Sequence, residues 1–300
     1  MRVLVTGSTG FIGKNFCKYL QESGIDVLHL SRKPSKSSNT IFWNPEKEVL
    51  DQQNIDHIDV VVHLAGESVA GLWTKKKKEK IYRSRVHGTK FLAESLKRVQ
   101  HPPKAFVCAS AIGLYGSRKE EVLEESSSPG AGFLSTVTYE WEKAAEVLNN
   151  LSRIVHFRFG LVLGKDGGLL PKMALAYKFG LGGKIGSGEQ FLSWVSVDDV
   201  CKMLFLAITK EDMQGPFNAV SPQPIQQKEF GKTLAEVLGK PFCFHMPSFL
   251  LKLFLGNQAK EMLLASTRVV PKRLFEMGYQ FLDQDLRKTF LKYVKKRSKR

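Results

Sequence analysis

The sequence is poor in cysteine and in acidic residues, and it has no long apolar run. Its 300 residues include four cysteines that lie far apart without a CxxC pair, which favours reduced thiols in the core over disulfides. No run reaches the roughly eighteen apolar residues of a membrane-spanning helix, and no charged-then-apolar leader opens the chain, so we expect a cytoplasmic protein. The seven histidines form no ligand-spaced cluster along the sequence, and we expect no metal site.

The shortage of acidic residues leaves a formal charge of +16. Much of it lies in two runs, Lys75–Lys78 and Lys295–Arg300. Such runs favour binding to nucleic acid or an anionic membrane. The alternative is a solvated helix start and a solvated tail, which aid solubility and attract phosphorylated ligands. We adopt this second interpretation and do not expect nucleic-acid binding.

The N-terminal stretch from Val3 to Gly13 has the pattern of a strand, a tight turn and a helix. Gly7 would permit the turn, Gly10 would let a pyrophosphate approach the backbone, and Gly13 would let the helix pack closely on the strand. The phosphates would sit at the helix start, where Phe11 and Ile12 follow Gly10. Glycine loops also form ordinary turns, so the prediction of a dinucleotide site depends on the following βαβ pattern.

The residues after the second predicted strand, Val27–Leu30, indicate which dinucleotide is bound. They are Ser31, Arg32 and Lys33, about twenty residues beyond the glycines, where the adenosine ribose is recognised. An acidic residue there would repel a 2′-phosphate, whereas a hydroxyl beside two cations suits it. We therefore predict NADP(H). The alternative is that these are ordinary solvated loop charges.

Two further segments extend the predicted cofactor site. A buried strand over 59–64 opens into small residues, and Leu64 and Ala65 would line the adenine or its ribose. A helix from about 77 to 98 carries Arg85. From spacing alone, Arg85 could reach the cofactor phosphates or form a surface ion pair.

Candidate catalytic groups follow the next predicted strand, 105–109. Ser110 ends that strand, and a predicted helix over 134–149 carries Tyr139 and Lys143 four residues apart, hence on one face. A cation beside a phenol favours the phenolate and would let Tyr139 exchange a proton, while Ser110 could donate to the same substrate oxygen. An exposed helix pair of this spacing also arises by chance.

Together these motifs resemble the short-chain dehydrogenase/reductase superfamily, in its extended or atypical NAD-dependent epimerase/dehydratase branch. The similar segments are Thr6–Gly13, His63–Gly66, Ser110–Gly116 and Tyr139–Lys143. Later segments are similar to a subgroup called "epimerase family protein", which carries a C-terminal module of unassigned function. They are Arg158–Gly164, Gly182–Gly188, Trp194–Asp199 and Phe217–Pro222.

The resemblance implies an NADP(H)-dependent oxidoreductase or epimerase that acts on a small carbonyl, alcohol or sugar-like substrate. In it, Ser31 and Arg32 would hold the 2′-phosphate, and the pair Ser84-Arg85 would also approach the cofactor. Members of the subgroup vary at the tyrosine and lysine, so a non-catalytic NADP(H)-binding regulator that acts on a protein partner is the alternative. Superfamily members often form dimers, which allows a homodimer here.

We expect an α/β fold, with a Rossmann-type doubly wound parallel sheet and a smaller C-terminal substrate-side domain. The NADP-binding domain would comprise 1–165 plus about 194–214, and the substrate side about 166–193 and 215–300. We further expect a mobile loop over 180–188 and a core or pocket-wall helix over 248–255. Asp198 and Asp199 could form an acid/base pair, but their position at a helix start favours a structural cap.

Overall fold

The computed structural model describes residues 1–294, and the chain divides into two compact units. Unit 1 comprises Met1–Ala111, Thr136–Arg158 and Cys201–Phe217, and unit 2 comprises Ile112–Ser135, Phe159–Val200 and the chain from Asn218 onward. The basic run Lys295–Arg300 lies outside the described residues.

The central feature of unit 1 is an eight-stranded sheet with the order β13-β8-β6-β5-β1-β2-β3-β4. From β3 through β6 the neighbouring strands are parallel, and β4 adds to the edge by pairing antiparallel with β3. The order reverses direction between β1 and β5, which is the topological switch point of a doubly wound sheet. The predicted Rossmann-type fold is therefore confirmed. The strands of the sheet are β1 (Arg2–Thr6), β2 (Asp26–Ser31), β3 (Thr40–Asn44), β4 (Val49–Leu50), β5 (Val60–His63), β6 (Ala105–Ala111), β8 (Arg153–Phe159) and β13 (Gly215–Ala219).

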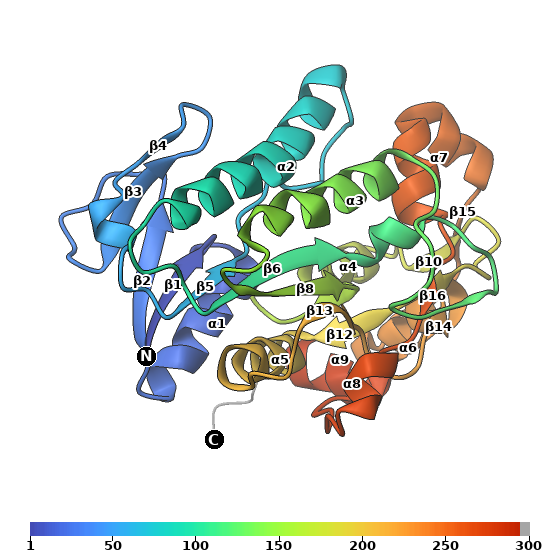
Figure 1. Ribbon diagram of the computed structural model, residues 1–300. Coiled ribbons are helices and arrows are strands. Elements are labelled where there is room, and N and C mark those ends of the chain that lie inside the picture. Colours follow the sequence, from blue (N-terminus) through green and yellow to red (C-terminus); the bar gives the residue numbers. More distant parts are fainter. Residues whose placement is uncertain (295–300) are drawn as a thin grey trace. The chain divides into compact units, whose positions relative to one another are not determined.

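Helices cover both faces of this sheet (Figure 1). On one face lie α2 (Lys75–Lys97) and α3 (Phe133–Ala145), which the 3₁₀ turn η3 (Glu146–Leu148) extends; on the other lie α1 (Phe11–Glu22) and α5 (Val197–Thr209). Tyr19 of α1 meets Phe205 of α5 with ring centroids 5.4 Å apart. The apolar strands β1 and β5 are buried because helices cover both sides.

Unit 2 is built from short strand pairs and helices. Its core packs Phe230 of α6 edge-on against Phe290 of α9, with centroids 5.0 Å apart, and includes Trp194 and Leu234. The strand pairs are β7 (Val122–Leu123) with β16 (Arg268–Val269), β9 (Leu161–Leu163) with β12 (Trp194–Ser196), β10 (Gly183–Ile185) with β15 (Phe244–Met246), and β11 (Phe191–Leu192) with β14 (Ile225–Gln226). The remaining helices are α4 (Leu170–Lys178), α6 (Gln227–Leu238), α7 (Ser248–Leu255), α8 (Lys272–Glu276) and α9 (Leu286–Val294), and the shorter turns are η1 (Gln53–Ile55), η2 (Ile112–Tyr115) and η4 (Ala259–Leu263).

Three sequence-based expectations are wrong in part. Helix α7 forms as predicted, but none of its residues is buried, and Phe249, Leu253 and Phe254 are 66–74% exposed, so it is no core helix. The glycine-rich stretch over 180–188 contains strand β10, which pairs in parallel with β15, because the narrow Gly183 lets the two backbones meet. Cys243 is exposed, whereas Cys17, Cys108 and Cys201 are buried as expected.

Among the described helices, none combines the length and apolarity needed to cross a membrane.

Candidate functional site

The glycine turn after β1 has the predicted backbone geometry. Gly7 has a φ of +67°, and a Cβ on it would lie 2.8 Å from the backbone of Leu64 and Ala65. A Cβ on Gly13 would lie 2.2 Å from the Gly7 carbonyl oxygen, so the close packing expected of Gly13 is confirmed. Helix α1 begins at Phe11 with Gly10 as its N-cap. The glycines of this turn therefore place no side chain beside the N-terminus of α1, where anions are stabilised.

The end of β2 lies next to this turn. Thr6 pairs in register with Leu30, so the residues that come next, Gly7 and Ser31, lie side by side. The Ser31 hydroxyl donates to the Lys33 carbonyl (2.9 Å) and accepts from the Lys33 amide (3.0 Å), which fixes the loop. Arg32 is exposed at this edge.

A cluster of charges surrounds Glu67, just after β5. The Lys77 ammonium lies 2.6 Å from its carboxylate and is only 19% exposed. This hydrogen bond lowers the pKa of Glu67, and Lys80 and Arg32 lower it further through their charges. Lys77 belongs to the lysine run that we interpreted as solvated, but its ammonium pairs with Glu67 instead. Three cations and one carboxylate thus gather at the carboxyl edge of β2 and β5.

A buried polar network fixes the segment that begins at Leu64. The Thr6 hydroxyl oxygen accepts hydrogen bonds from the amides of Leu64 (3.1 Å) and Ala65 (3.0 Å). Thr6 also lies 2.7 Å from His63 Nδ1, and His63 Nε2 lies 2.9 Å from the Thr89 hydroxyl. Burial lowers the pKa of His63 to about 3, so the ring is neutral at physiological pH. The network holds β1, β5 and α2 together beneath the predicted adenosine position.

Arg85 lies beside the same segment. Its guanidinium donates to the Glu67 carbonyl (2.8 Å), stacks 5.1 Å from the Trp141 ring centroid, and lies against Gly66. Burial lowers the pKa of Arg85 to about 10. The side chain is therefore positioned by backbone and ring contacts at the strand end, rather than by the surface ion pair that spacing alone allowed.

Ser110 belongs to a second buried network, which includes Glu142 of α3. The Ser110 hydroxyl donates to Glu142 Oε1 (2.5 Å), and Arg158 of β8 holds the same carboxylate with two bonds of 2.8 Å. Burial opposes the charge of Glu142, but Arg158 and Ser110 outweigh it and lower the carboxyl pKa. His156 lies close enough for its charge to act on Glu142, and its buried Nδ1 has no hydrogen-bond partner. Glu142 was not predicted as a site residue; its place within the segment Tyr139–Lys143, which resembles the family, was the available signal.

Tyr139 and Lys143 lie one helical turn apart on the α3 surface. Tyr139 is 42% exposed, and Lys143 Nζ lies 4.6 Å from the centre of its ring. A hydrogen bond with the Tyr139 hydroxyl raises the pKa of Lys143, which keeps the ammonium charged. The structure thus brings Tyr139 to Lys143 and Ser110 to Glu142. Such a phenol beside a cation can exchange a proton with a bound oxygen.

A surface hollow of about 660 Å³ lies elsewhere on unit 1. It is lined by residues that precede β5 and β6, including Asp59 and Lys104, together with Arg153. Because β1, β5 and β6 are parallel, this hollow lies at the amino edge of the sheet, away from the glycine turn. We therefore place the candidate site at the carboxyl edge.

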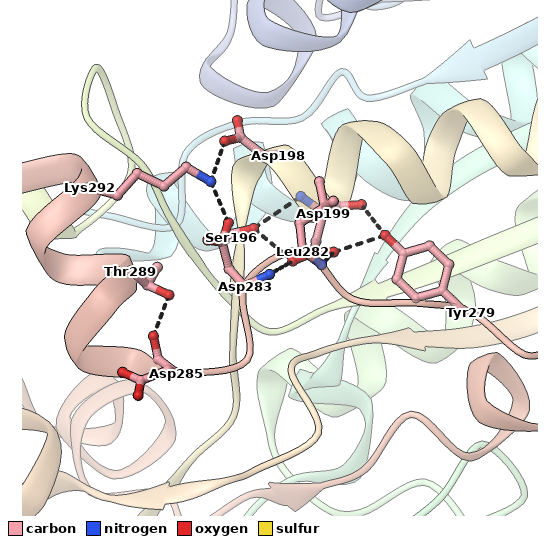
Figure 2. Close-up of polar contacts among 9 residues, drawn as sticks. All are labelled: Ser196, Asp198, Asp199, Tyr279, Leu282, Asp283, Asp285, Thr289 and Lys292. Carbon is pink, nitrogen blue, oxygen red and sulfur yellow. Dashed lines mark hydrogen bonds and ion pairs between the residues drawn. The ribbon is translucent and has the colours of Figure 1, made fainter.

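The carboxylates at the start of α5 have a structural role in unit 2 (Figure 2). Asp199 is fully buried and accepts hydrogen bonds from the amides of Leu282 (2.8 Å) and Asp283 (3.0 Å) and from the Tyr279 hydroxyl (3.0 Å). Its own amide donates to the Ser196 hydroxyl, which caps the helix. Asp198 instead pairs with Lys292 at 2.7 Å. The two carboxylates are therefore structural as expected, but the helix cap is the Ser196 hydroxyl and not either aspartate.

Comparison with known proteins agrees with this architecture. The NAD dependent epimerase/dehydratase family matches residues 3–220, and a domain of unknown function, DUF1731, matches residues 246–291. The chain is 36% identical over 292 residues to the epimerase family protein YfhF of Bacillus subtilis, with 95% of each chain covered.

Two solved structures are also similar. The human epimerase family protein SDR39U1, crystallised with NADPH, is 32% identical with a TM-score of 0.91, over 98% of this chain and 99% of that one. A nucleoside-diphosphate sugar epimerase from Corynebacterium glutamicum is 31% identical with a TM-score of 0.80, over 98% of this chain and 58% of that one. The resemblance found in the sequence is thus confirmed, and the chain belongs to the NAD-dependent epimerase/dehydratase family.

Proposed function

We propose that this protein is an NADP(H)-dependent oxidoreductase or epimerase that acts on a small carbonyl, alcohol or sugar-like substrate. The observation that carries the choice of NADP(H) is the group of cations, Arg32, Lys77 and Lys80, around Glu67, in which Arg32 directly follows Ser31. A 2′-phosphate brought to this edge gains from the net positive charge of three cations and one carboxylate, whereas the ribose hydroxyl of NAD gains little from it. The NADPH bound to the human relative SDR39U1 supports the same choice.

The residues present fit a dinucleotide. Gly7, Gly10 and Gly13 keep side chains away from the helix N-terminus at Phe11 and Ile12, where the pyrophosphate would bind. Ser31 and Arg32 would hold the 2′-phosphate, and Leu64 and Ala65, fixed by Thr6, would flank the adenosine. Arg85 would hold the segment that follows Leu64 and Ala65 in place by donating to the Glu67 carbonyl.

The proton chemistry belongs to α3 and the end of β6. When bound, the nicotinamide supplies or accepts the hydride. Tyr139 would exchange a proton with the substrate oxygen, and the Lys143 ammonium lies beside its ring. Ser110 has one proton, which it donates to Glu142; toward a substrate it therefore offers lone pairs, which suit a hydroxyl group better than a carbonyl. Glu142 acts here as a positioning residue. We assign the substrate side to the segments 166–193 and 215–300.

A second candidate function is a non-catalytic NADP(H)-binding regulator that acts on a protein partner. The observation that favours it is the engagement of the Ser110 hydroxyl by a buried carboxylate that Arg158 already neutralises. Such a serine can be a purely structural group. The two candidates share the cofactor site and differ only in hydride transfer.

Hydride transfer separates the two candidates. We would follow NADPH oxidation against a panel of aldehydes, ketones and oxidised sugar nucleotides, comparing the wild type with Tyr139→Phe and with Tyr82→Phe, a tyrosine that bonds Glu140. The enzyme proposal expects turnover that falls about 10²- to 10⁴-fold in Tyr139→Phe and is retained in Tyr82→Phe, with NADPH affinity unchanged in both. Tight NADPH binding without turnover on any probe would favour the regulator.

A further inference from the structure

Two histidines and one aspartate gather on unit 1, away from the cofactor site. Asp56 and His57 lie in the loop before β5, and His101 lies in the loop after α2, 45 residues further along the chain. One ligand atom from each lies within 4.8 Å of the others. The adjacent pair Asp56-His57 and the distant His101 show no metal-site spacing, which is why the sequence did not reveal this group.

Two distances in this cluster match those between ligand atoms of one metal ion. Asp56 Oδ2 lies 3.3 Å from His101 Nδ1 and 3.6 Å from His57 Nε2. For a tetrahedral zinc ion with bonds of about 2.0–2.2 Å, two ligand atoms lie about 3.3–3.6 Å apart. At these separations one ion could bridge Asp56 Oδ2 and either imidazole nitrogen, and rotation of the exposed rings would bring both nitrogens to it.

The carboxylate is also held in place. The other carboxylate oxygen of Asp56, Oδ1, accepts a hydrogen bond from the His101 amide (2.9 Å), which leaves Oδ2 facing the rings. The two imidazoles stack with centroids 4.0 Å apart and an interplanar angle of 22°, so both rings must rotate before their nitrogens point at one ion. His57 has a φ of +55°, a region that non-glycine residues seldom adopt, and its carbonyl accepts from Arg2. Outer contacts of this kind orient ligands in known metal sites.

From this geometry we propose that Asp56, His57 and His101 form a binding site for a divalent transition-metal ion of the zinc class. Two imidazole nitrogens and one carboxylate oxygen suit zinc, nickel or copper(II), whereas magnesium and calcium prefer all-oxygen ligands. His57 and His101 are 64% and 50% exposed, so an ion can enter from solvent and water can complete its coordination. The ion would tie together the loops that precede β5 and β6.

This site is independent of the proposed enzymatic function. The two loops lie at the amino ends of parallel strands, whereas the glycine turn lies at the carboxyl end of β1. We therefore expect metal binding to stabilise the fold and to leave NADPH affinity unchanged.

The test is calorimetric titration of the full, tag-free chain with ZnCl₂, in a Cys243→Ser background that removes the exposed thiol. We expect one ion per chain, with affinity at least about tenfold weaker in His57→Ala and in His101→Ala. His87→Ala, which removes an exposed histidine of α2, is the matched control and should bind as the parent does. Zinc should also raise the melting temperature of the parent and not that of His101→Ala.

Electron paramagnetic resonance of the copper(II)-loaded protein identifies the ligands directly. We expect nitrogen hyperfine structure from two imidazoles, reduced to one in His101→Ala. Absence of saturable binding at one ion per chain would overturn the proposal, and so would binding that survives both histidine substitutions. In that case the three side chains form only a hydrogen-bonded tie between the two loops.

Discussion

Two buried carboxylates, Glu142 in unit 1 and Asp199 in unit 2, have opposite surroundings. Asp199 accepts hydrogen bonds from two backbone amides and from two hydroxyls, those of Tyr279 and Ser196. Glu142 is held by the Arg158 guanidinium and by one hydroxyl, that of Ser110. Backbone amides that donate to Asp199 hold the segment at Leu282 and Asp283 in place. The buried Glu142–Arg158 pair instead joins two side chains, and well-packed apolar side chains could replace such a pair without loss of stability. The partners of a buried carboxylate therefore help to separate a structural junction from a candidate site.

The largest expected effect on stability is that of Glu142→Ala. Removing one member of a buried ion pair takes the Glu142 carboxylate away from the buried Arg158 charge, and we expect the free energy of unfolding to fall by about 3–5 kcal/mol. The double variant Glu142→Gln with Arg158→Met should recover most of the loss, since no buried charge then remains. Chemical denaturation measures both. A double variant no more stable than Glu142→Ala would show that charge balance is not what Glu142 provides.

A somewhat smaller loss is expected for Asp199→Ala. The amides of Leu282 and Asp283 and the Tyr279 hydroxyl lose their acceptor. We expect the free energy of unfolding to fall by about 2–4 kcal/mol, because water replaces part of the lost hydrogen bonding. Asp198→Ala is the matched control, because its partly exposed pair with Lys292 should contribute about 1 kcal/mol or less. Chemical denaturation measures both variants. Equal losses of unfolding free energy would show that Asp199 contributes no more to stability than Asp198 does.

The smallest of these effects is a pH dependence that arises from His63. Its pKa is about 3 in the folded chain, against the ordinary histidine value of 6.5, so the unfolded chain binds the proton first as the pH falls. Stability should therefore decline from about pH 6.5 down toward pH 3, by roughly 2 kcal/mol between pH 7.5 and 5 from this group alone. Denaturation of His63→Gln across that range should show a shallower slope. An unchanged slope would assign the pH dependence to other groups.

Local sequence patterns predicted the Rossmann-type secondary structure well. The spacing of Gly7, Gly10 and Gly13 gave the strand, turn and helix, because each requirement lies within a few residues. The four-residue spacing of Tyr139 and Lys143 likewise placed them together on α3. Their chemical roles stay predictions.

The contacts that give the candidate site its chemistry were not predictable in the same way. Glu142 and Arg158 lie on a helix and a strand, and Lys77 reaches Glu67 across a connecting loop, so their pairing depends on tertiary packing. The apolar run of α7 shows a related limit. Hydrophobicity predicted burial, but the exposure of Phe249, Leu253 and Phe254 depends on which elements pack against the helix.

The most direct test of the central claim is the nucleotide preference of the cation group at the end of β2. Fluorescence titration of the wild type, Arg32→Ala and the exposed-loop control Lys36→Ala with NADPH and NADH measures it. The wild type should bind NADPH at least about tenfold more tightly than NADH, because a hydrogen bond to a charged group contributes about 1.5–3 kcal/mol. This preference should be lost in Arg32→Ala and kept in Lys36→Ala. Equal affinity for both nucleotides in the wild type, or a preference that survives Arg32→Ala, would contradict the proposal that Arg32 selects NADP(H).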